Sequence, residues 1–511
     1  MTGPSRKHLP ILVASLMFLI TMTNAIGRSL ARPLDPIEGK WFGMAGFPQD
    51  RIEIGFEIKR NDRGELKVYL YEPVLNFYGL ELPGVMIKQG EQYVLKEYQL
   101  SVTTKNGGLE GTYFGLNAPI SLKRTDNLPS EVPVPDLPKG PGPKWQTKLG
   151  AGAIYASAAV RDGVAYVGTT GGIFHAVNLK DGSLLWTFPA GRPIYGEALA
   201  TDEAIFFACD NGYLFKLERK TGKEVWRYDM GDSRVARILP HQSVFSFDYR
   251  APRPVISDGV IFIGSGDGSF HAINASSGER VWRFESSAVD AGAAGSLPDF
   301  TGAEKKIRST ALINGSHVIF GSLDQMVYAL DRKTGKEVWK KNTRGNIDST
   351  PALVGDKLVV GNRNGLLVAL DPTTAEVKWR MLFWGSAVES EAVPAGDLFY
   401  IGSSDLRRVS LIDPKDARVI WRTDVYGWPW GRVLVANKML YVGVASATPY
   451  DMRHLGSFTA LDRQTGKIVW RWPMPEWPGS FMNGFTASPA LDSRTVVIGG
   501  LDGTLYAFPA E

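Results

Sequence analysis

Two Glu/Arg couples occupy corresponding points of a repeated strand pattern. Glu197 and Arg253 form the first couple, in "YGEALA" and "APRPVI", and Glu391 and Arg432 form the second, in "SEAVPA" and "WGRVLV". Other copies of the pattern hold Ser or Thr at this point, as in "DSTPALV" and "TASPALD". A carboxylate beside a guanidinium group makes a salt bridge between strands or binds a polar ligand, and two facing carboxylates support acid/base chemistry or bind a cation. These interpretations stay open at this stage.

Further polar and aromatic side chains lie two residues earlier along four of the same strands. They are Arg308, Asp348, Glu389 and Trp430, and they would complete a polar ligand site. Four tryptophans lie in or beside unusually long connections: Trp428, Trp430, Trp472 and Trp477. They are expected to form a stacking floor for a sugar or a quinone, or to pack these loops against the scaffold.

A repeat positions all of these residues. The segment "ERKTGKEVW" ends at Trp226 and "DRKTGKEVW" ends at Trp339, and looser copies end at Trp186, Trp282, Trp379, Trp421 and Trp470. Each copy follows two short runs of β-branched and aromatic residues bounded by Gly and Asp, which is typical of hairpin strands. Forty residues separate Trp186 from Trp226, a length that fits the four antiparallel strands of one propeller blade.

The two ends of the repeat region complement each other. The last copy, "VVIGGLDGTLYAF", reaches Glu511 without its own Trp strand, and "KWQTKLG", residues 144–150, matches the outer strands of other copies. A ring closed by this early segment has no open first or last blade. We therefore predict an all-β fold: an eight-bladed β-propeller closed by an N-terminal outer strand. Each marker Trp is expected to pack on the next blade and to donate its N–H to a backbone carbonyl.

Aligning the copies by their strand-end glycines gives one channel-facing position in each blade. These positions are Ser157, Glu197, Arg253, Thr310, Thr350, Glu391, Arg432 and Ser488. The positions two residues earlier are Tyr155, Tyr195, Ala251, Arg308, Asp348, Glu389, Trp430 and Thr486. Blades two and three lie opposite blades six and seven in a ring of eight, so the two Glu/Arg couples are expected to face each other across the axis.

The repeat G-x-x-D-G-x-L-Y-A-L-D-x-x-T-G-K-x-x-W resembles the PQQ-like β-propeller family over residues 144–511. This family includes quinoprotein dehydrogenases and BamB-type factors of outer-membrane assembly. The resemblance implies either a scaffold that binds a protein partner or an enzyme with PQQ and calcium. The chain departs from the enzymes because Cys209 is its single cysteine, so their adjacent cysteine pair is absent, as is a haem motif. It departs from the scaffolds because it lacks the lipid-anchor cysteine.

The segment before the propeller divides into three parts. Residues 1–25 are predicted to be a signal peptide, because a basic start precedes a short apolar run and a small-residue cut site. Residues 36–125 alternate polar and apolar residues and weakly resemble small lipocalin-like β domains, so we expect an antiparallel barrel or sandwich of six to eight strands. Residues 126–143 form a proline-rich linker that is expected to act as a semi-rigid spacer.

The formal net charge of +4 and the lack of a long Lys/Arg cluster argue against a nucleic-acid partner. We predict a monomeric periplasmic or secreted protein with no membrane span after signal cleavage. Its expected role is that of a binding or scaffolding module whose charged channel mouth takes a protein partner or a small polar or sugar-like ligand. An exported enzyme, either a quinoprotein dehydrogenase or a carbohydrate-active enzyme, is the alternative. No cofactor is assured and no metal site is expected, although PQQ with calcium stays open.

Overall fold

The computed structural model describes residues 35–114, 117–150, 152–231, 237, 248–286, 304–447, 453–475 and 481–510. The predicted signal peptide, residues 1–25, lies outside this described part. In the described residues the regular structure is β-sheet, apart from two short 3-10 helices, η1 (Pro73–Leu75) and η2 (Lys96–Tyr98). None of the helices found there is long and apolar enough to cross a membrane.

The small N-terminal β domain is a single antiparallel sheet of nine strands in the order β4-β3-β2-β1-β9-β8-β7-β6-β5, so the prediction of six to eight strands was too low. The strands are β1 (Gly39–Ala45), β2 (Ile52–Arg60), β3 (Leu66–Glu72), β4 (Phe77–Glu81), β5 (Ile87–Gln89), β6 (Gln92–Leu95), β7 (Leu100–Lys105), β8 (Gly108–Thr112) and β9 (Pro119–Arg124). Alternating buried residues such as Ile54, Phe56 and Ile58 form its core.

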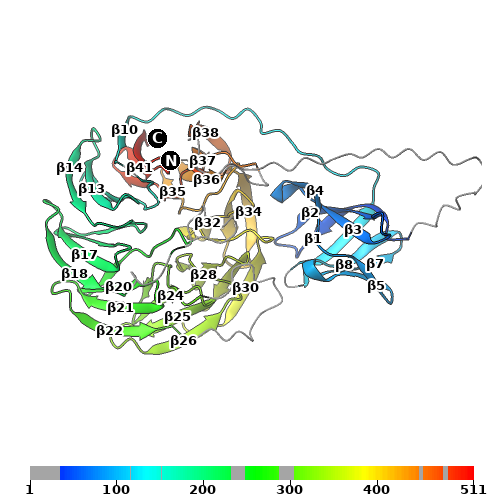
Figure 1. Cartoon of the computed structure of the whole chain (residues 1–511), viewed down its shortest axis with the longest axis horizontal. Helices are drawn as coiled ribbons and strands as arrows, with labels where there is room; N and C mark the ends of the chain where they lie inside the picture. Colours follow the sequence, from blue (N-terminus) through cyan, green and yellow to red (C-terminus); the bar gives the residue numbers. More distant parts are fainter. Residues whose placement is uncertain are drawn as a thin grey trace, which may run out of the picture. The chain divides into compact units, whose positions relative to one another are not determined.

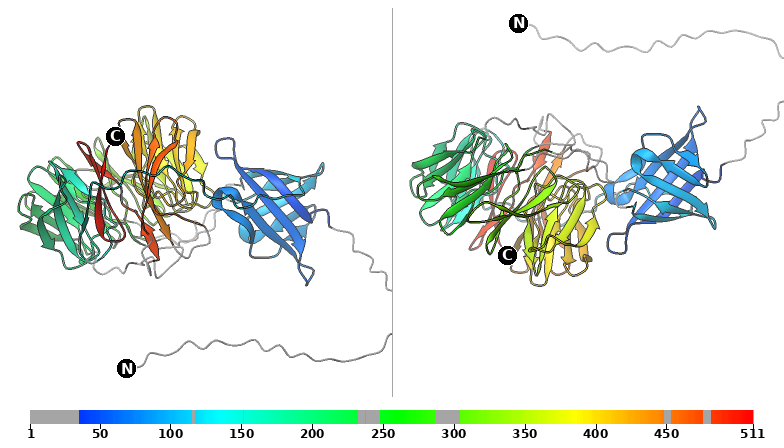
Figure 2. Two further views of the ribbon diagram at one scale, coloured as in Figure 1. Left: turned by 90° about the horizontal axis from the view of Figure 1, so that it is seen from above. Right: turned by 90° about the horizontal axis from the view of Figure 1, so that it is seen from below.

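The remaining strands form the predicted eight-bladed propeller, with eight separate sheets arranged around one axis (Figure 1; Figure 2). The innermost strands are β11 (Ala159–Arg161), β15 (Leu199–Ala200), β19 (Val255–Ser257), β23 (Leu312–Asn314), β27 (Ala352–Val354), β31 (Val393–Ala395), β35 (Leu434–Ala436) and β40 (Ala490–Asp492). The second strands are β12 (Val164–Gly168), β16 (Ala204–Ala208), β20 (Val260–Gly264), β24 (His317–Gly321), β28 (Lys357–Gly361), β32 (Leu398–Gly402), β36 (Met439–Ala447) and β41 (Thr495–Gly499).

The outer half of each blade is equally regular. The third strands are β13 (Ile173–Asn178), β17 (Tyr213–Glu218), β21 (Ser269–Asn274), β25 (Met326–Asp331), β29 (Leu366–Leu370), β33 (Arg408–Asp413), β37 (Ser457–Asp462) and β42 (Thr504–Pro509). The outermost strands are β14 (Leu184–Pro189), β18 (Glu224–Asp229), β22 (Arg280–Glu285), β26 (Glu337–Asn342), β30 (Val377–Leu382), β34 (Arg418–Asp424), β38 (Ile468–Pro473) and β10 (Trp145–Lys148). One further strand, β39 (Met482–Gly484), extends blade seven by pairing with β36.

The ring closes as the sequence predicts. Strand β10 is the outermost strand of blade eight, where Trp145 pairs with Ala507 and Lys148 pairs with Thr504 of β42. In Figure 1 β10 accordingly lies beside the red C-terminal strands. Closure by this early segment gives blade eight the fourth strand that the C-terminal copy lacks.

The marker tryptophans pack between blades in the predicted way. A Cβ atom added to Gly222 would lie 2.4 Å from the Trp186 ring, which shows how closely the turn glycine of one blade covers the tryptophan of the blade before it. Trp186 Nε1 also donates to the carbonyl oxygen of Arg219 at 3.1 Å. Four other markers donate to the next blade in the same way: Trp145, Trp226, Trp282 and Trp379. The Nε1 atoms of Trp339, Trp421 and Trp470 are buried without a partner among the described residues.

The proline-rich linker also has a packing role, beyond that of a spacer. Its Gly140 donates its backbone N–H to the carbonyl oxygen of Arg471 in β38, and the Arg471 N–H donates to Pro138. An added Cβ atom on Gly140 would lie 2.3 Å from Cε3 of Trp470. Blade eight has no Thr-Gly turn of its own, so Gly140 covers Trp470 in the manner of the turn glycines elsewhere.

Candidate functional site

The propeller axis contains a cavity with an empty volume of about 660 Å³, a figure that includes open solvent at its mouth. All eight aligned inner-strand positions line this cavity: Ser157, Glu197, Arg253, Thr310, Thr350, Glu391, Arg432 and Ser488. Six of the eight positions two residues earlier line it as well: Tyr155, Tyr195, Ala251, Arg308, Asp348 and Thr486. The repeat register therefore places one residue of each blade at the same depth along the channel.

The two Glu/Arg couples form a charged ring across the channel. Arg253 Nη1 donates to Glu197 Oε1 at 3.1 Å, and Arg432 Nη1 donates to Glu391 Oε2 at 3.4 Å. Arg432 Nη2 also lies 3.7 Å from Glu197 Oε2, so the couples meet across the axis. Burial by itself would lower the pKa of Arg432, but Glu197 and Glu391 outweigh burial and raise it. The ring is thus charged and internally neutralised.

Glu197 and Arg253 also border a second cavity on the far side of the ring. This groove has an empty volume of about 700 Å³, open solvent included, and is bounded by the innermost strands of blades one to three. Its other lining residues are mostly apolar, among them Val160, Leu199 and Ile256. Glu197 and Arg253 therefore border both the polar chamber and this groove.

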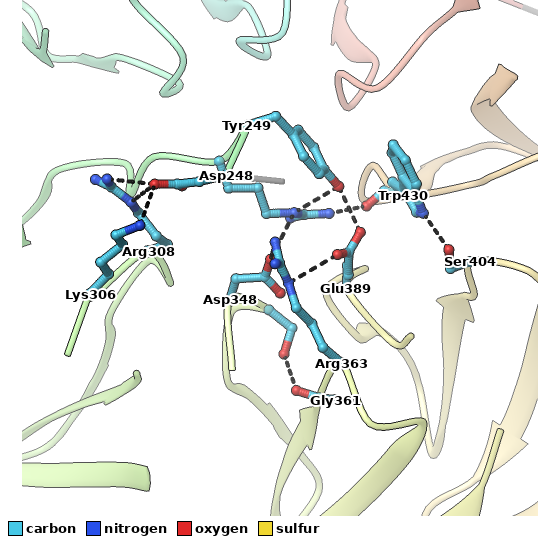
Figure 3. Close-up of polar contacts among 12 residues, drawn as sticks. Asp248, Tyr249, Lys306, Arg308, Asp348, Gly361, Arg363, Glu389, Ser404 and Trp430 are labelled. Carbon is cyan, nitrogen blue, oxygen red and sulfur yellow. Dashed lines mark hydrogen bonds and ion pairs between the residues drawn. The ribbon is translucent and has the colours of Figure 1, made fainter. Parts of the chain in front are cut away.

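Residues 248–250, which we call the plug segment, lie across the channel on the other side of the polar chamber (Figure 3). They end the long connection between β18 and β19. Asp248 Oδ2 accepts from Arg308 Nη2 at 2.8 Å and lies 3.7 Å from Lys306 Nζ, and its Oδ1 accepts from Arg237 Nη1 at 3.0 Å. Burial raises the pKa of Asp248, but Arg308 and Arg237 outweigh burial and hold that pKa below its usual value. This carboxylate anchors the plug segment to blade four.

Tyr249 connects the plug segment to blades six, seven and one. Its hydroxyl group donates to Glu389 Oε2 at 2.8 Å, and its ring stacks on Trp430 with centroids 5.0 Å apart. The ring also lies 6.0 Å from that of Tyr155. Burial raises the pKa of Tyr249 well above its usual value, so its hydroxyl group stays protonated and acts as a hydrogen-bond donor in this network.

Arg250 and Arg363 hold the carboxylates of blades five and six. Arg363 donates to Asp348 Oδ2 at 2.7 Å and lies 3.3 Å from Glu389 Oε1 (Figure 3). Arg250 donates to the Trp430 carbonyl oxygen at 2.7 Å and lies 3.9 Å from Asp348 Oδ2. Burial and the neighbouring charge of Asp348 raise the pKa of Glu389, and the two arginines oppose this shift.

Two buried oxygen atoms in the cavity wall have no hydrogen-bond partner among the described residues. These atoms are Asp348 Oδ1 and Thr486 Oγ1. Asp348 is 2% exposed and Thr486 is 5% exposed. Buried polar atoms are nearly always hydrogen-bonded, to protein, to water or to a ligand. Both residues line the polar chamber. Both atoms therefore have unused hydrogen-bonding capacity beside the chamber.

The eight sequence-predicted site residues divide into two groups. Glu197, Arg253, Arg308, Asp348, Glu391 and Arg432 line the cavity. Glu389 and Trp430 are not in its wall and lie behind the plug segment, where both contact Tyr249. Trp430 is covered on its other face by Trp428, with ring centroids 4.6 Å apart, so its ring does not form a free stacking floor.

The remaining candidates from the sequence are packing residues or lie outside the described part. Trp472 packs against Tyr506 with ring centroids 5.3 Å apart. Trp477 is outside the described residues. Cys209 is buried, and burial raises the pKa of its thiol to about 11, which fits a packing role for this side chain.

The sequence pattern did not indicate Tyr249, Arg250 and Arg363 as residues of the site. Tyr249 and Arg250 lie in a long inter-blade connection, and its excess length was the single signal that pointed to them. Arg363 lies in the hairpin turn between β28 and β29, one residue past Asn362, where the repeat pattern predicts an ordinary turn.

The family comparison agrees with this geometry. A family model described as outer membrane protein assembly factor BamB (PQQ_2) matches residues 138–248, 246–381 and 382–511. The chain belongs to the PQQ_2 family. Solved PQQ-like propellers share its fold: BamB from Moraxella catarrhalis is 17% identical with a TM-score of 0.53, covering 72% of this chain and 99% of that chain. Quinohemoprotein alcohol dehydrogenase from Comamonas testosteroni is 16% identical with a TM-score of 0.54, covering 72% and 76%.

Sequence relatives of the chain include both an outer membrane protein assembly factor and enzymes. BamB of Yersinia pestis is 25% identical over 151 residues, which are 29% of this chain and 37% of the relative. Quinohemoprotein alcohol dehydrogenase of Comamonas testosteroni is 28% identical over 248 residues, 44% of this chain and 33% of the relative. Tetrathionate hydrolase of Acidithiobacillus ferrooxidans is 21% identical over 369 residues, 65% of this chain and 59% of the relative. The chain thus matches less than two thirds of the length of each.

The donor set of the cavity fits a calcium-bound quinone poorly. Within the part of the chain that the structure describes, no three His, Cys, Asp or Glu side chains form a group suited to a metal ion. Calcium favours six to eight oxygen ligands. Here Glu197 and Glu391 accept from arginines of the ring, and Asp348 accepts from Arg363. The carboxylates of this cavity are arranged to neutralise guanidinium groups.

Proposed function

We propose that this protein is an exported binding module that holds a small polyhydroxylated, sugar-like ligand in the polar chamber of its propeller. The observation that carries the proposal is the pair of unpartnered buried acceptors, Asp348 Oδ1 and Thr486 Oγ1, in the wall of that chamber. Hydroxyl groups of a polyol donate to such acceptors and accept from Arg250, Arg253 and Arg308 in the same wall. A ligand with both donors and acceptors matches this mixed lining.

Aromatic side chains support a sugar-like ligand over a simple ion. Tyr155 and Tyr195 line the chamber, with ring centroids 5.5 Å apart, and Tyr249 lines it from the plug segment. Aromatic faces with polar groups around them suit the apolar patches and hydroxyl groups of a sugar ring. The relatives and neighbours reported above include assembly factors and enzymes, so the ligand class has to come from this lining.

The test measures the melting temperature of the purified protein with D-glucose, D-galactose and N-acetyl-D-glucosamine at millimolar concentrations. A ligand that binds the folded state raises the melting temperature with its concentration. We expect at least one of the three sugars to do so in the wild-type protein. The variants Thr486→Val and Asp348→Asn are expected to reduce this shift. Thr504→Val, a buried substitution in the same blade outside the cavity wall, is expected to retain it.

The same assay decides the enzyme alternative. A melting-temperature rise with PQQ and calcium together, and none with the sugars, would replace the proposal with a quinoprotein. If neither the sugars nor PQQ with calcium shifts the melting temperature, the chamber is a polar core and the binding proposal is wrong. Detection of the protein in the periplasmic or culture-medium fraction of its host tests export, and a cytoplasmic location would contradict that part.

A further inference from the structure

Blade six carries a cluster of arginines away from the polar chamber. Arg407 and Arg408 stand where β32 turns into β33, and Arg422 lies in the neighbouring strand β34. In the pairing of β33 with β34, Arg408 lies opposite Asp424 and Ser410 lies opposite Arg422. Arg408 and Arg422 are therefore diagonal neighbours on one face of the sheet, a separation that long side chains bridge.

The described residues supply few counter-charges for these arginines. Asp424 Oδ2 accepts from Arg407 Nη2 at 2.5 Å, and Asp424 Oδ1 accepts from the Tyr426 backbone N–H at 2.7 Å. The guanidinium groups of Arg408 and Arg422 have no hydrogen bond or ion pair with any residue in the described part of the chain. Arg407 Nε is buried without a partner there as well. Three cations thus share one carboxylate.

A further carboxylate, that of Asp50, does not neutralise the cluster. Asp50 acts electrostatically on Arg422, but Asp50 Oδ2 accepts from the Leu382 backbone N–H at 3.0 Å and Asp50 Oδ1 accepts from Phe47 at 2.8 Å. Burial and the like charge of Arg422 lower the pKa of Arg408 to about 10, against the usual value near 12.5, and Asp424 opposes this shift only in part.

The backbone conformation of Arg407 is a second, independent indication of a functional role. It has a positive φ of 53°, at the residue that precedes the third strand of its blade. Five other blades have a glycine with positive φ there: Gly172, Gly212, Gly268, Gly365 and Gly503. Gln325 of blade four is the other non-glycine residue with a positive φ at this point. A long cation in the left-handed region carries a conformational cost, and such costs concentrate at functional sites.

The equivalent cations of blades two and three have carboxylate partners. Arg227 follows the marker Trp226 as Arg422 follows Trp421, and it donates to Glu224 Oε1 at 2.7 Å. Arg283 likewise lies 3.2 Å from Asp267 and 3.3 Å from Glu285. Arg380 of blade five and Arg471 of blade seven also follow a marker Trp, and neither has an ion pair within the described part of the chain. Blade six differs from the other blades in having a second arginine, Arg408, at the first position of its third strand.

We propose that Arg408 and Arg422 form a binding site for a tetrahedral oxoanion of the phosphate or sulfate class, with Arg407 held beside them by Asp424. A doubly charged oxoanion offers several acceptor oxygens at once and offsets the repulsion between the two guanidinium groups. Both residues are half-buried. The site is separate from the polar chamber and stands whether or not a sugar binds there.

The test measures the melting temperature with inorganic phosphate, against sodium chloride at equal ionic strength. Wild-type protein is expected to gain several degrees with millimolar phosphate, and the double variant Arg408→Gln/Arg422→Gln is expected to lose most of this gain. Without phosphate, Arg408→Gln is expected to melt at or above the wild-type temperature, because the substitution removes one of three like charges. The matched control Arg227→Gln, at the equivalent position of blade two, should keep the full phosphate effect.

Two results would overturn the proposal. One is a phosphate effect no larger than that of chloride in the wild-type protein, and the other is an equal phosphate effect in the double variant. Isothermal titration with phosphate and then with sulfate separates the two anions within the class. The sugar-dependent shift of the polar chamber should survive in the double variant, so failure of one site is distinguishable from failure of the other.

Discussion

Arg432 Nη2 of blade seven lies 3.7 Å from Glu197 Oε2 of blade two, an ion pair that crosses the propeller axis. These side chains are 29% and 18% exposed, so solvent screens the pair only in part. The pair joins two blades that are separated by most of the repeat sequence. It is the contact that turns two Glu/Arg couples into one charged ring.

Replacing Arg432 with Gln is expected to lower the free energy of unfolding by about 1–2 kcal/mol, between the values for exposed and buried pairs. The substitution leaves Glu391 without its cation at 3.4 Å, while Glu197 keeps Arg253. Urea unfolding measures the change. The double variant Glu391→Gln/Arg432→Gln should recover part of the loss, and Arg227→Gln at the exposed surface should change little. An unchanged midpoint for Arg432→Gln would show that the ring contributes no stability.

Replacing Tyr249 with Phe is expected to lower the free energy of unfolding by about 1–2 kcal/mol, because the buried Glu389 loses the donor at 2.8 Å. Tyr249→Ala should additionally uncover the ring of Trp430, which is 3% exposed in the intact protein. Acrylamide quenching of tryptophan fluorescence measures that exposure. Tyr155→Phe, whose hydroxyl group is outside this network, is the control. Equal quenching in Tyr249→Ala and the wild-type protein would contradict the position of the plug segment.

The small β domain is expected to lose stability as the pH rises above about 5. Burial raises the pKa of Glu72 from 4.5 to about 8, and this side chain is 2% exposed. The folded state therefore binds more protons than the unfolded state between these two values, so stability is fully present below 4.5 and falls as the pH rises toward 8. Each unit of pKa difference corresponds to about 1.4 kcal/mol.

The variant Glu72→Gln should remove most of this pH dependence. Melting temperatures at pH 5 and pH 8.5 measure the effect. The control is Glu57→Gln, at a partly exposed carboxylate that pairs with Lys59. We expect a fall between the two conditions in the wild-type protein and in the control, and a smaller fall in Glu72→Gln. Identical pH profiles for all three proteins would mean that Glu72 titrates normally.

Replacing Gly140 with Ala is expected to lower the melting temperature, because the added Cβ atom would lie 2.3 Å from Trp470. Overpacking of this kind costs about 1–3 kcal/mol. Gly142→Ala is a matched control in the same linker, since a Cβ atom there meets nothing within 4 Å. Equal melting temperatures for the two variants would show that the linker acts as a spacer alone.

The repeat pattern in the sequence predicted most of the fold. Each blade packs its outer Trp against the next blade, so aligning the copies located the closing strand at Trp145. Each inner strand starts at the same depth, so the same alignment located the channel positions of Glu197 and Arg432. The nine strands of the small β domain were harder to count, because its strands have no internal repeat and short ones such as β5 leave little periodicity.

The sequence by itself determined the ring, its closure and the depth of each inner-strand residue. Every blade makes the same packing contacts with the next blade and therefore has the same local sequence pattern. Only the tertiary structure decided that Tyr249 crosses the axis to meet Glu389, and that Arg408 and Arg422 share a face on which Asp424 forms its ion pair with Arg407 instead. Such contacts join a loop or strand to side chains far away along the chain. No local pattern encodes them, since they depend on where the closed ring brings those side chains.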